Sequence, residues 1–564
     1  MAGLSHSHVK GPDVPALEEL TIPDFLARTV AAQRSHDACV FSESGERWSW
    51  EQLSEKVDEL AAGLLAEGIC RGDRVGIWAP NRPEWLLTQF ATARIGAILV
   101  NINPAYRRAE LQYALAKAGV KALITAVSFK TSQYLEMLQD IAPELNQSRP
   151  GRLESKNLPS LKLVIQVGDT PVAGMFSFND VMEGGRAMQR SRLDSISAVL
   201  TPHDAINLQF TSGTTGSPKA ATLTHHNIVN NARLIADCMR LTRRDRLCIP
   251  VPLYHCFGMV LGSLACVASG STMVFPGEGF DALQTLQTLS QERCTGVHGV
   301  PTMFSAMVNL PEFSEFDLGT LRTGIMAGAP CPIQLMKQVV SEMHLKEMTI
   351  AYGMTETSPA SFQSAIDDPI ERRVSTVGRI HPHVEAKVVD ESGDIVATGE
   401  QGELYTRGYL VMQKYWEDPE QTAKSIDSDG WMHTGDLATI DSEGYCNIVG
   451  RVKDMLIRGG ENIYPREIEE FLLGHAGIQD VQVFGIPDEK YGEEICAWIV
   501  PAQGAQVSLE DVRSHCEGQI AHFKVPRFVR TVSEFPMTVT GKPQKFIMRE
   551  KMVAELGLKE TSTA

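Results

Sequence analysis

The sequence has none of the features that mark a secreted or membrane-spanning chain. Its 564 residues contain no apolar run long enough to cross a bilayer, and the N-terminal segment lacks the apolar stretch of a signal peptide. The eleven cysteines are scattered without a CxxC pair, which argues against a disulfide framework and against a zinc site. We therefore expect a cytoplasmic protein with reduced thiols and no transmembrane segment.

Positive charge is also scarce. The chain has 52 Lys and Arg against 69 Asp and Glu, so its formal net charge is −17 at pH 7. Such an acidic surface repels nucleic acids and anionic membranes, and we expect no nucleic acid as a partner. An anionic ligand would have to bind at a local cluster of Lys and Arg.

Short apolar segments alternate with helical patterns along most of the chain. The helical pattern is clearest over residues 51–68, which end at a glycine. This alternation predicts an α/β fold with parallel sheets covered by helices. In such sheets, ligands bind beyond the carboxyl ends of the strands. The predicted strands are residues 74–80, 96–104, 121–126, 162–168, 206–211, 246–253, 271–276, 295–301, 323–328 and 348–353.

A chain of this length needs more than one hydrophobic core, and its pattern changes twice. Residues 384–408 alternate like strands with turn residues between them, which predicts a small antiparallel unit. After residues 450–460, the pattern runs helix, strand, strand, helix, strand. We predict a large N-terminal domain, residues 1–452, with two parallel-type αβ sheets plus the antiparallel unit, and a small α+β domain, residues 453–564.

The stretch 209–219, QFTSGTTGSPK, is rich in glycine and small hydroxyl residues and ends in a lysine. Main-chain N–H groups in a loop of this kind can converge on an oxyanion. The spacing does not fit the Walker pattern GxxxxGK[ST], so the stretch is a candidate phosphate cradle of another kind. A flexible surface turn is the alternative. The candidate ligating residues are Thr211, Ser212, Gly213, Thr214, Thr215, Gly216 and Lys219.

The motif YGMTETSP at 352–359 directly follows a predicted strand. Here Thr355 could donate to a phosphate, and Tyr352 could stack on a base. Glu356 could hold Mg²⁺, which prefers oxygen ligands. An ordinary polar loop with a solvated glutamate is the alternative.

Two later motifs contain further candidates. Asp436, in WMHTGDLA at 431–438, could accept hydrogen bonds from both hydroxyls of a ribose, and Arg451 could reach the same sugar or a phosphate. Lys542 follows a glycine near the chain end and could neutralise charge that develops in a transition state. Taken singly, each of these residues is more easily explained as a turn or surface residue.

The order and spacing of the four motifs resemble those of the adenylate-forming ANL superfamily, which includes acyl-CoA synthetases, nonribosomal-peptide adenylation domains and luciferases. The resemblance runs from about Trp48 to Arg549. Stretches such as VNINPAYRRAEL, GRVKDMLIRGGENIYPREIE and HFKVPRF are most similar to the medium-chain acyl-CoA synthetase branch. The resemblance implies a ligase that activates a medium- to long-chain fatty acid with ATP and Mg²⁺, through an acyl-adenylate, and transfers it to CoA. It leaves a homodimer open.

The resemblance also implies roles for single residues. Residues 211–219 would hold the β- and γ-phosphates, Thr355 would contact the α-phosphate, and Glu356 would be the Mg²⁺ ligand. Lys542 would bridge the carboxylate and the α-phosphate during adenylation. The remaining nucleotide contacts would be Gly328, Ala329, Pro330, Tyr352 and Gly353 around the adenine, and Asp436 and Arg451 at the ribose.

A mobile C-terminal domain is a further implication, with Lys453 at the hinge. Local basic residues and a narrow glycine passage would accept CoA, with surface pairing as the alternative for the charges. An apolar tunnel would hold the acyl chain, with ordinary core packing as the alternative. The CoA candidates are Arg458, Gly459, Gly460, Lys524, Arg527 and Arg530, and the acyl candidates are His255, Met259, Val260, Val300 and Met303.

One position departs from the family pattern, and other functions stay open. The phosphate loop of the family continues with glycine after the lysine, whereas this chain has Ala220, which would be strained if the position needs a positive φ. The pair His255 and Cys256 is not expected to form a dyad, because neighbours in a strand point to opposite faces.

The alternative functions are loading of a carrier-protein phosphopantetheine, luciferase-type oxygenation, and nucleotide binding without catalysis.

Overall fold

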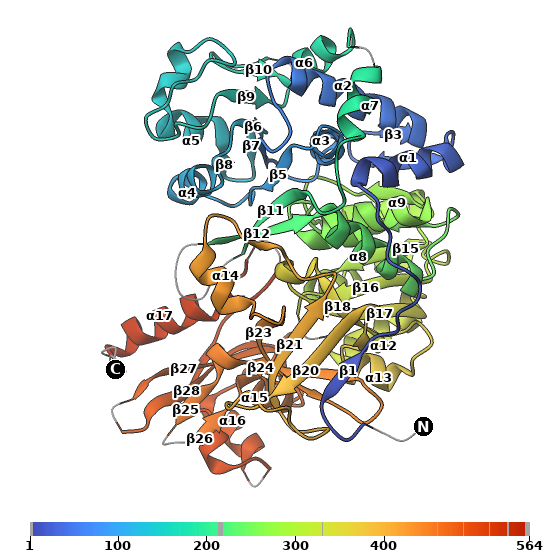
Figure 1. Cartoon of the computed structure of the whole chain (residues 1–564). Helices are drawn as coiled ribbons and strands as arrows, with labels where there is room; N and C mark the ends of the chain where they lie inside the picture. The colour runs from blue at the N-terminus through green and yellow to red at the C-terminus, as the bar shows by residue number, and fades with distance from the viewer. Residues whose placement is uncertain are drawn as a thin grey trace. The chain divides into compact units, whose positions relative to one another are not determined.

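The structure is a computed structural model that describes residues 4–168, 170–188, 190–211, 218–329, 331–458, 461–488, 490–517, 519–538 and 541–558. Figure 1 shows the chain, which divides into two compact units. One unit comprises Val9–Glu385 and Thr406–Met432, and the other comprises Met1–His8, Ala386–Tyr405 and His433–Ala564. The predicted domain boundary after residue 452 stays a prediction.

The larger unit contains two mainly parallel sheets, as the sequence predicts. The first sheet has eight strands, and antiparallel pairing occurs where β11, β12 and β22 meet. Its order is β10 (Phe176–Ser177), β9 (Leu163–Gln166), β6 (Ala122–Thr125), β4 (Arg74–Trp78), β5 (Ile98–Asn101), β11 (Ala205–Thr211), β12 (Lys219–Thr224) and β22 (Lys414–Tyr415).

The second sheet has nine strands and is parallel from β17 to β2, with antiparallel strands at both edges. Its order is β19 (Arg379–Ile380), β18 (Ala360–Gln363), β17 (Glu347–Gly353), β16 (Thr323–Ala327), β15 (Gly296–Gly299), β13 (Arg246–Cys248), β14 (Thr272–Phe275), β2 (Asp37–Phe41) and β3 (Glu46–Ser49).

Helices share one large core with strands of both sheets. The predicted helix is present as α2 (Trp50–Ala66), which begins with a capping box between Ser49 and Gln52. The core also takes residues from α1 (Ile22–Gln33), α3 (Pro83–Arg94), α8 (His225–Cys238), the π-helix η2 (Phe257–Leu264) and α9 (Ala265–Ser269). A second core packs α10 (Ala282–Gln291), α11 (Pro301–Val308) and α12 (Ile333–Glu342) on the nine-stranded sheet. The other helices of this unit are α4 (Arg108–Ala118), α5 (Tyr134–Ile141), α6 (Phe178–Gly185), α7 (Arg190–Ser197), α13 (Ile370–Ser375) and α14 (Pro419–Ser425).

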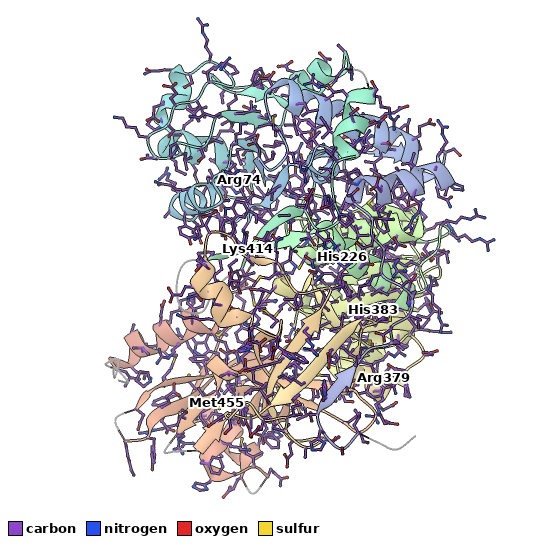
Figure 2. The ribbon with its side chains drawn as sticks, viewed as in Figure 1. Arg74, His226, Arg379, His383, Lys414 and Met455 are labelled. Carbon is purple, nitrogen blue, oxygen red and sulfur yellow. The ribbon has the colours of Figure 1, made fainter. Side chains whose placement is uncertain are left out.

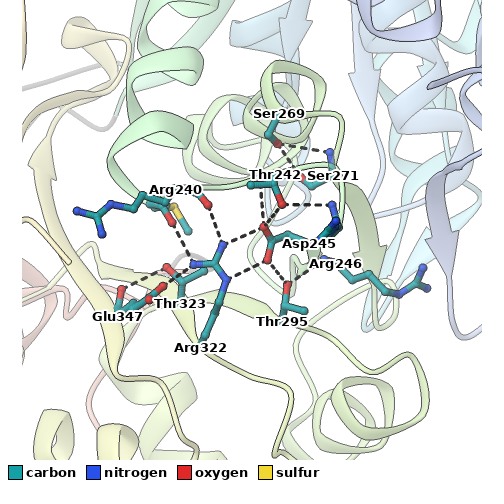
Figure 3. Close-up of polar contacts among 12 residues, drawn as sticks. Arg240, Thr242, Asp245, Arg246, Ser269, Ser271, Thr295, Arg322, Thr323 and Glu347 are labelled. Carbon is teal, nitrogen blue, oxygen red and sulfur yellow. Dashed lines mark hydrogen bonds and ion pairs between the residues drawn. The ribbon is translucent and has the colours of Figure 1, made fainter. Parts of the chain in front are cut away.

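An ionic network joins the N-terminal ends of neighbouring parallel strands in the nine-stranded sheet (Figure 3). Asp245, just before β13, accepts from Arg322 Nη2 at 2.9 Å and from the Thr295 hydroxyl at 2.7 Å. Arg322, just before β16, also pairs with Glu347 at the start of β17. Burial raises the pKa of Asp245, but the hydrogen bonds from Arg322, Thr295 and Thr242 outweigh burial and the pKa is lowered. Charge-assisted bonds of this kind hold the strand starts in a fixed arrangement.

The antiparallel unit predicted around residues 384–408 is also present. A five-stranded sheet has the order β1 (His8–Lys10), β20 (Val384–Val389), β21 (Gly402–Gly408), β23 (Met432–Ile440) and β24 (Cys446–Arg451). Strands β23 and β24 are antiparallel, and their register places Asp436 opposite Arg451.

The C-terminal part is the predicted α+β module with some added elements. Its sheet has the order β26 (Glu461–Ile463), β25 (Leu456–Arg458), β28 (Gly492–Pro501) and β27 (Ile478–Asp488), and β29 (Phe528–Thr531) pairs in parallel with β28. The helices α15 (Pro465–Leu472), α16 (Leu509–Cys516) and α17 (Lys545–Leu556) pack with this sheet in two small cores. The sequence reading identified α15, α16, β27, β28 and β29, and it missed β25, β26 and α17.

Candidate active site

Three of the predicted adenine and acyl residues lie at the carboxyl edge of the nine-stranded sheet. Val300 directly follows β15, Gly328 follows β16, and Tyr352 lies near the end of β17. Gly328 has φ +89°, and a Cβ at this position would lie 3.2 Å from Val300 Cγ1. The parallel strand order thus brings residues that are distant in sequence to one edge, where ligands bind in sheets of this type.

The motif after β17 folds into a tight turn. A Cβ at Gly353 would lie 1.8 Å from the carbonyl oxygen of Pro359, so only glycine fits there. The Thr357 hydroxyl donates to the same carbonyl at 2.6 Å. Thr355 begins the short 3₁₀-helix η4 (Thr355–Thr357), and its Oγ1 lies 3.9 Å from Cys256 Sγ. The turn therefore places the predicted phosphate contact beside the segment that holds the acyl candidates.

The neighbouring residues His255 and Cys256 correct one expectation. They do not lie in a strand, because β13 ends at Cys248 and the π-helix begins at Phe257. Cys256 Sγ lies 3.8 Å from His255 Nδ1, so the two side chains do not point to opposite faces. His255 Nδ1 also accepts from the N–H of Phe257 at 3.1 Å.

The predicted metal ligand is buried and has a partner that sequence reasoning missed. Glu356 is 5% exposed, and its Oε1 accepts a hydrogen bond from the Tyr415 hydroxyl at 2.8 Å. Burial raises the pKa of Tyr415, and the Glu356 carboxylate raises it further. The ammonium of Lys219 lies 4.8 Å from the centre of the Tyr415 ring. Tyr415 thereby connects two of the predicted motifs. It lies on β22 next to Lys414, and Lys414 is labelled in Figure 2.

The phosphate-loop motif is the connection of a hairpin. Thr211 ends β11 and pairs in register with Lys219, which begins β12. Ala220 lies within β12, is 1% exposed, and its carbonyl accepts from Trp416 N–H at 2.8 Å. This position is extended, so the missing glycine causes no backbone strain. The predicted contacts Ser212, Gly213, Thr214, Thr215, Gly216, Pro330, Gly459 and Gly460 lie outside the described residues.

Four of the five acyl candidates are apolar residues packed in the core, and the fifth, His255, is half-buried. Met259 and Val260 lie on the π-helix η2, which sequence periodicity did not predict, and Met303 lies on α11. The exposed fractions of the four apolar candidates run from 0% for Val260 to 7% for Met303. Burial of this degree agrees with an apolar pocket wall and equally with core packing, so the acyl role stays a prediction.

The two predicted ribose contacts bind each other. In the smaller unit, Arg451 Nε donates to Asp436 Oδ1 at 2.9 Å across β23 and β24. Asp436 is 4% exposed, whereas the Arg451 side chain is 53% exposed. The exposed guanidinium beside a buried carboxylate can take part in further hydrogen bonds.

The predicted catalytic lysine and hinge also lie in the smaller unit. The Lys542 side chain is exposed, and its backbone N–H donates to the Thr538 hydroxyl at 2.9 Å. The Thr538 N–H in turn donates to the Lys542 carbonyl at 2.8 Å, so two hydrogen bonds to Thr538 hold the backbone at this lysine. Lys453 is the middle residue of the 3₁₀-helix η5 (Val452–Asp454), which joins β24 to β25.

Some of the predicted CoA residues line a cavity of about 340 Å³ in the C-terminal module. Arg458 pairs with the buried Glu494 and stacks on the Tyr491 ring at 4.4 Å. Arg527 Nη1 lies 3.3 Å from Glu494 Oε2. Arg513, on α16, also lines this cavity, and sequence reasoning missed it.

Lys524 has a different environment. Its ammonium pairs with Glu467 Oε1 at 2.6 Å and is not among the groups that line this cavity. Lys524 thus has the surface ion pair that the sequence left open, and its role in binding CoA stays a prediction.

Within the described parts of the chain, no group of three or more His, Cys, Asp or Glu side chains is arranged to hold a metal ion. Among the helices described there, none is both long and apolar enough to traverse a lipid bilayer.

Comparison with known families gives two matches along the chain. Residues 26–416 match the AMP-binding enzyme family. Residues 467–542 match the C-terminal domain of AMP-binding enzymes. The first match includes the hairpin, the turn after β17 and Tyr415, and the second includes Arg513, Arg527 and Lys542.

Similar individual proteins match the chain over nearly its whole length. The mitochondrial medium-chain acyl-CoA ligase ACSF2 of Danio rerio is 45% identical over 560 residues, which cover 98% of this chain and 92% of the relative. The anthranilate CoA ligase AuaEII in complex with anthranoyl-AMP has a TM-score of 0.84 at 26% identity, covering 97% of this chain and 99% of that one. ATP-bound MatB from Rhodopseudomonas palustris has a TM-score of 0.81 at 28% identity, covering 94% and 99%.

Proposed function

The chain belongs to the AMP-binding enzyme family, and from this premise we propose that it is an ATP-dependent acid–thiol ligase for fatty acids. A medium- to long-chain carboxylate attacks the α-phosphate of ATP, giving an acyl-adenylate and pyrophosphate. The thiol of CoA then attacks the acyl carbon and releases AMP. The name of the relative from Danio rerio, a medium-chain acyl-CoA ligase, supports this substrate class.

The observation that carries the proposal is the position of Tyr415. Its hydroxyl donates a hydrogen bond to Glu356, and the Lys219 ammonium lies over its ring. A cation and a carboxylate from two motifs therefore contact the same tyrosine. A phosphate chain needs cations for its charges, and a buried carboxylate needs a counter-charge. We assign Lys219 and Thr211 to the β- and γ-phosphates and Thr355 to the α-phosphate.

The chemistry of Glu356 fits Mg²⁺. Mg²⁺ is usually held by one or two carboxylates together with substrate phosphates and waters. The Glu356 carboxylate, which accepts a hydrogen bond from Tyr415, would supply one oxygen ligand of this kind. When bound, Mg²⁺ would neutralise phosphate charge, while Lys219 and the main chain of the hairpin bind and orient the phosphates.

The remaining assignments follow the sequence prediction. Asp436 would accept from the ribose hydroxyls, and Arg451 would hold the same sugar. Lys542 would bind the substrate carboxylate and the α-phosphate together, screening the repulsion between two anions. Lys453 would act as the hinge between the adenylation and thioester steps.

The cavity near Arg458 supports a site for the phosphates of CoA. Arg458, Arg513 and Arg527 bring three guanidinium groups to its wall, against the carboxylate of Glu494. Arginine binds phosphate bidentately, so this local positive charge would attract CoA against the net charge of −17.

The test is a panel of carboxylic acids from acetate to oleate, with aryl and terpenoid acids added, assayed for AMP release with and without CoA. We expect acid-dependent AMP release and acyl-CoA formation with aliphatic acids of medium length. ATP–pyrophosphate exchange driven by the acid should be retained without CoA. Product that accumulates only with a carrier protein, or no response to any acid, would contradict the proposal.

A further inference from the structure

The π-helix η2 (Phe257–Leu264) is held by side chains from neighbouring elements. The N–H of Ala265 donates to the carbonyl of Val260, five residues earlier, which is the π-helical spacing. Two glycines let this helix approach the chain after β13 closely. A Cβ at Gly258 would lie 2.4 Å from the carbonyl oxygen of Pro252, and one at Gly262 would lie 3.0 Å from Ile249 Cγ2.

Gln89, from α3, makes the central contact. It is 3% exposed, and its Nε2 donates to the carbonyl of Met259 at 3.2 Å. The Ser263 hydroxyl lies 2.6 Å from the same carbonyl and 3.0 Å from Gln89 Oε1. Gln89 thus supplies a donor and an acceptor to one turn of the π-helix.

His298, from β15, makes a second contact with the π-helix. The N–H of Ile325 donates to its Nδ1 at 3.2 Å, so its proton lies on Nε2 and is donated to the carbonyl of Leu261 at 2.9 Å. The fully buried imidazole therefore has both nitrogens in use. Burial lowers its pKa to about 4, which keeps the ring neutral.

Met259 is contacted at its side chain as well. Asn101 Nδ2 lies 3.5 Å from Met259 Sδ and also donates to the carbonyl of Tyr254 at 2.8 Å. Gln209 Nε2 lies 4.0 Å from the same sulfur. Both the backbone and the side chain of this acyl candidate are therefore fixed by buried amides.

We propose that Gln89, together with His298, fixes the register of the π-helix that carries Met259 and Val260, and so determines which acyl chain length the enzyme accepts. This inference rests on the proposed function. Successive helical residues are turned by about 100°. If the π-turn relaxes to an α-turn by one residue, the side chains that follow it rotate and the wall of the acyl pocket changes. Gln89 and His298 are proposed as positioning residues that act through the backbone of the helix, at the carbonyls of Met259 and Leu261.

The test compares kcat/KM for saturated acids from butyrate to palmitate in the full-length enzyme. Gln89→Leu removes both contacts at similar volume, and Ser263→Ala removes only the hydroxyl. The matched control is Gln166→Leu: Gln166 is equally buried, on β9, where its Nε2 donates to the Thr170 carbonyl at 2.9 Å and its Oε1 accepts from Val172 N–H at 3.0 Å.

We expect Gln89→Leu to reduce the discrimination between the best acid and one four methylenes longer by about tenfold, the scale of hydrocarbon discrimination in apolar pockets. Ser263→Ala should give a smaller change in the same direction. Gln166→Leu should lower the Tm and leave the chain-length profile unchanged.

The inference is overturned if Gln89→Leu and Ser263→Ala keep the wild-type profile. Should Gln89→Leu fail to fold, the Ser263→Ala profile decides. A wild-type enzyme with no acid-dependent AMP release contradicts the proposed function itself, whereas an active wild type with unaltered variant profiles contradicts only this inference.

Discussion

The Tyr415 hydroxyl donates a 2.8 Å hydrogen bond to Oε1 of the buried Glu356. Because the motif of Glu356 and the strand of Tyr415 are separated by about sixty residues of sequence, the contact exists only in the folded chain. It sets the orientation of the one carboxylate that we assign to Mg²⁺. Two consequences can be measured, one for the metal and one for the nucleotide.

Tyr415→Phe should lower kcat/KM for ATP and weaken the use of Mg²⁺ in adenylation. A hydrogen bond to a charged group contributes about 1.5–3 kcal/mol, so kcat/KM for ATP should fall by about tenfold to a hundredfold. ATP–pyrophosphate exchange measured against Mg²⁺ concentration gives the result. Tyr134→Phe, which removes a buried hydroxyl that donates to the Pro104 carbonyl, is the control. An unchanged Mg²⁺ dependence in Tyr415→Phe would argue against the assignment of Glu356.

Lys542→Ala should separate the two half-reactions. Loss of a group that stabilises developing charge costs about 10²–10³ in rate, and adenylate formation should fall by at least this factor. Thioester formation from preformed acyl-adenylate and CoA should be largely retained. Lys551→Ala, an exposed lysine on α17, is the matched control. Equal losses in both half-reactions would contradict the proposed role of Lys542 in adenylation.

Lys453→Pro should mainly slow thioester formation, whereas Lys542→Ala should mainly slow adenylation. Proline fixes φ and restricts the residue before it, so it limits a backbone rotation within η5. We expect thioester formation to slow more than adenylation, as measured by the two half-reactions in parallel. Lys453→Ala keeps the backbone freedom and should behave like the wild type. A normal CoA step in the proline variant would be evidence against a hinge here.

Some parts of the fold and of the site could be predicted from the sequence, and others could not. All ten strands predicted from apolar runs are present, because a buried parallel strand needs a continuous apolar segment and a turn signal at its end. Tyr415 and Arg513 could not be predicted, since each contacts its site through pairing of distant segments. The π-helix was missed because its spacing depends on Gln89 and His298, which come from other elements. The condition for strain at Ala220, a positive φ, is not met, because the residue lies in the strand after the loop.

Arg513→Ala should weaken binding of CoA. Arg513 lines the same cavity as Arg458 and Arg527, and an arginine–phosphate contact is a strong charge-assisted bond. We expect the KM for CoA to rise by about tenfold, with little change in the KM for ATP. Dephospho-CoA as the substrate shows whether the 3′-phosphate is the group that is bound. Arg530→Ala is the comparison, because Arg530 is also a CoA candidate from the sequence but lines a separate cavity beside Trp498. Equal KM values for CoA in both variants would exclude this cavity.

We expect the folded state to lose stability in mild acid because of the buried His225. Its imidazole is fully buried at the start of α8, and its Nδ1 accepts from the N–H of Ile22 at 3.0 Å. Burial lowers its pKa from 6.5 to about 4, although Asp204 and Asp24 partly oppose this shift. The folded state therefore binds fewer protons than the unfolded state between these two values. The stabilisation is present above pH 6.5 and is lost as the pH falls towards 4.

The size of the effect follows from the shift, which is worth about 3 kcal/mol at full extent. His225→Asn keeps an acceptor for Ile22 but does not titrate in this range. The variant should have a lower Tm than the wild type at about pH 7.5. The difference in Tm should shrink at about pH 5, because folding at that pH requires His225 of the wild type, but not the asparagine of the variant, to lose a proton. The other buried histidines titrate in both proteins, so the comparison isolates His225. A difference in Tm that stays constant with pH would show that the His225 imidazole does not titrate with a lowered pKa.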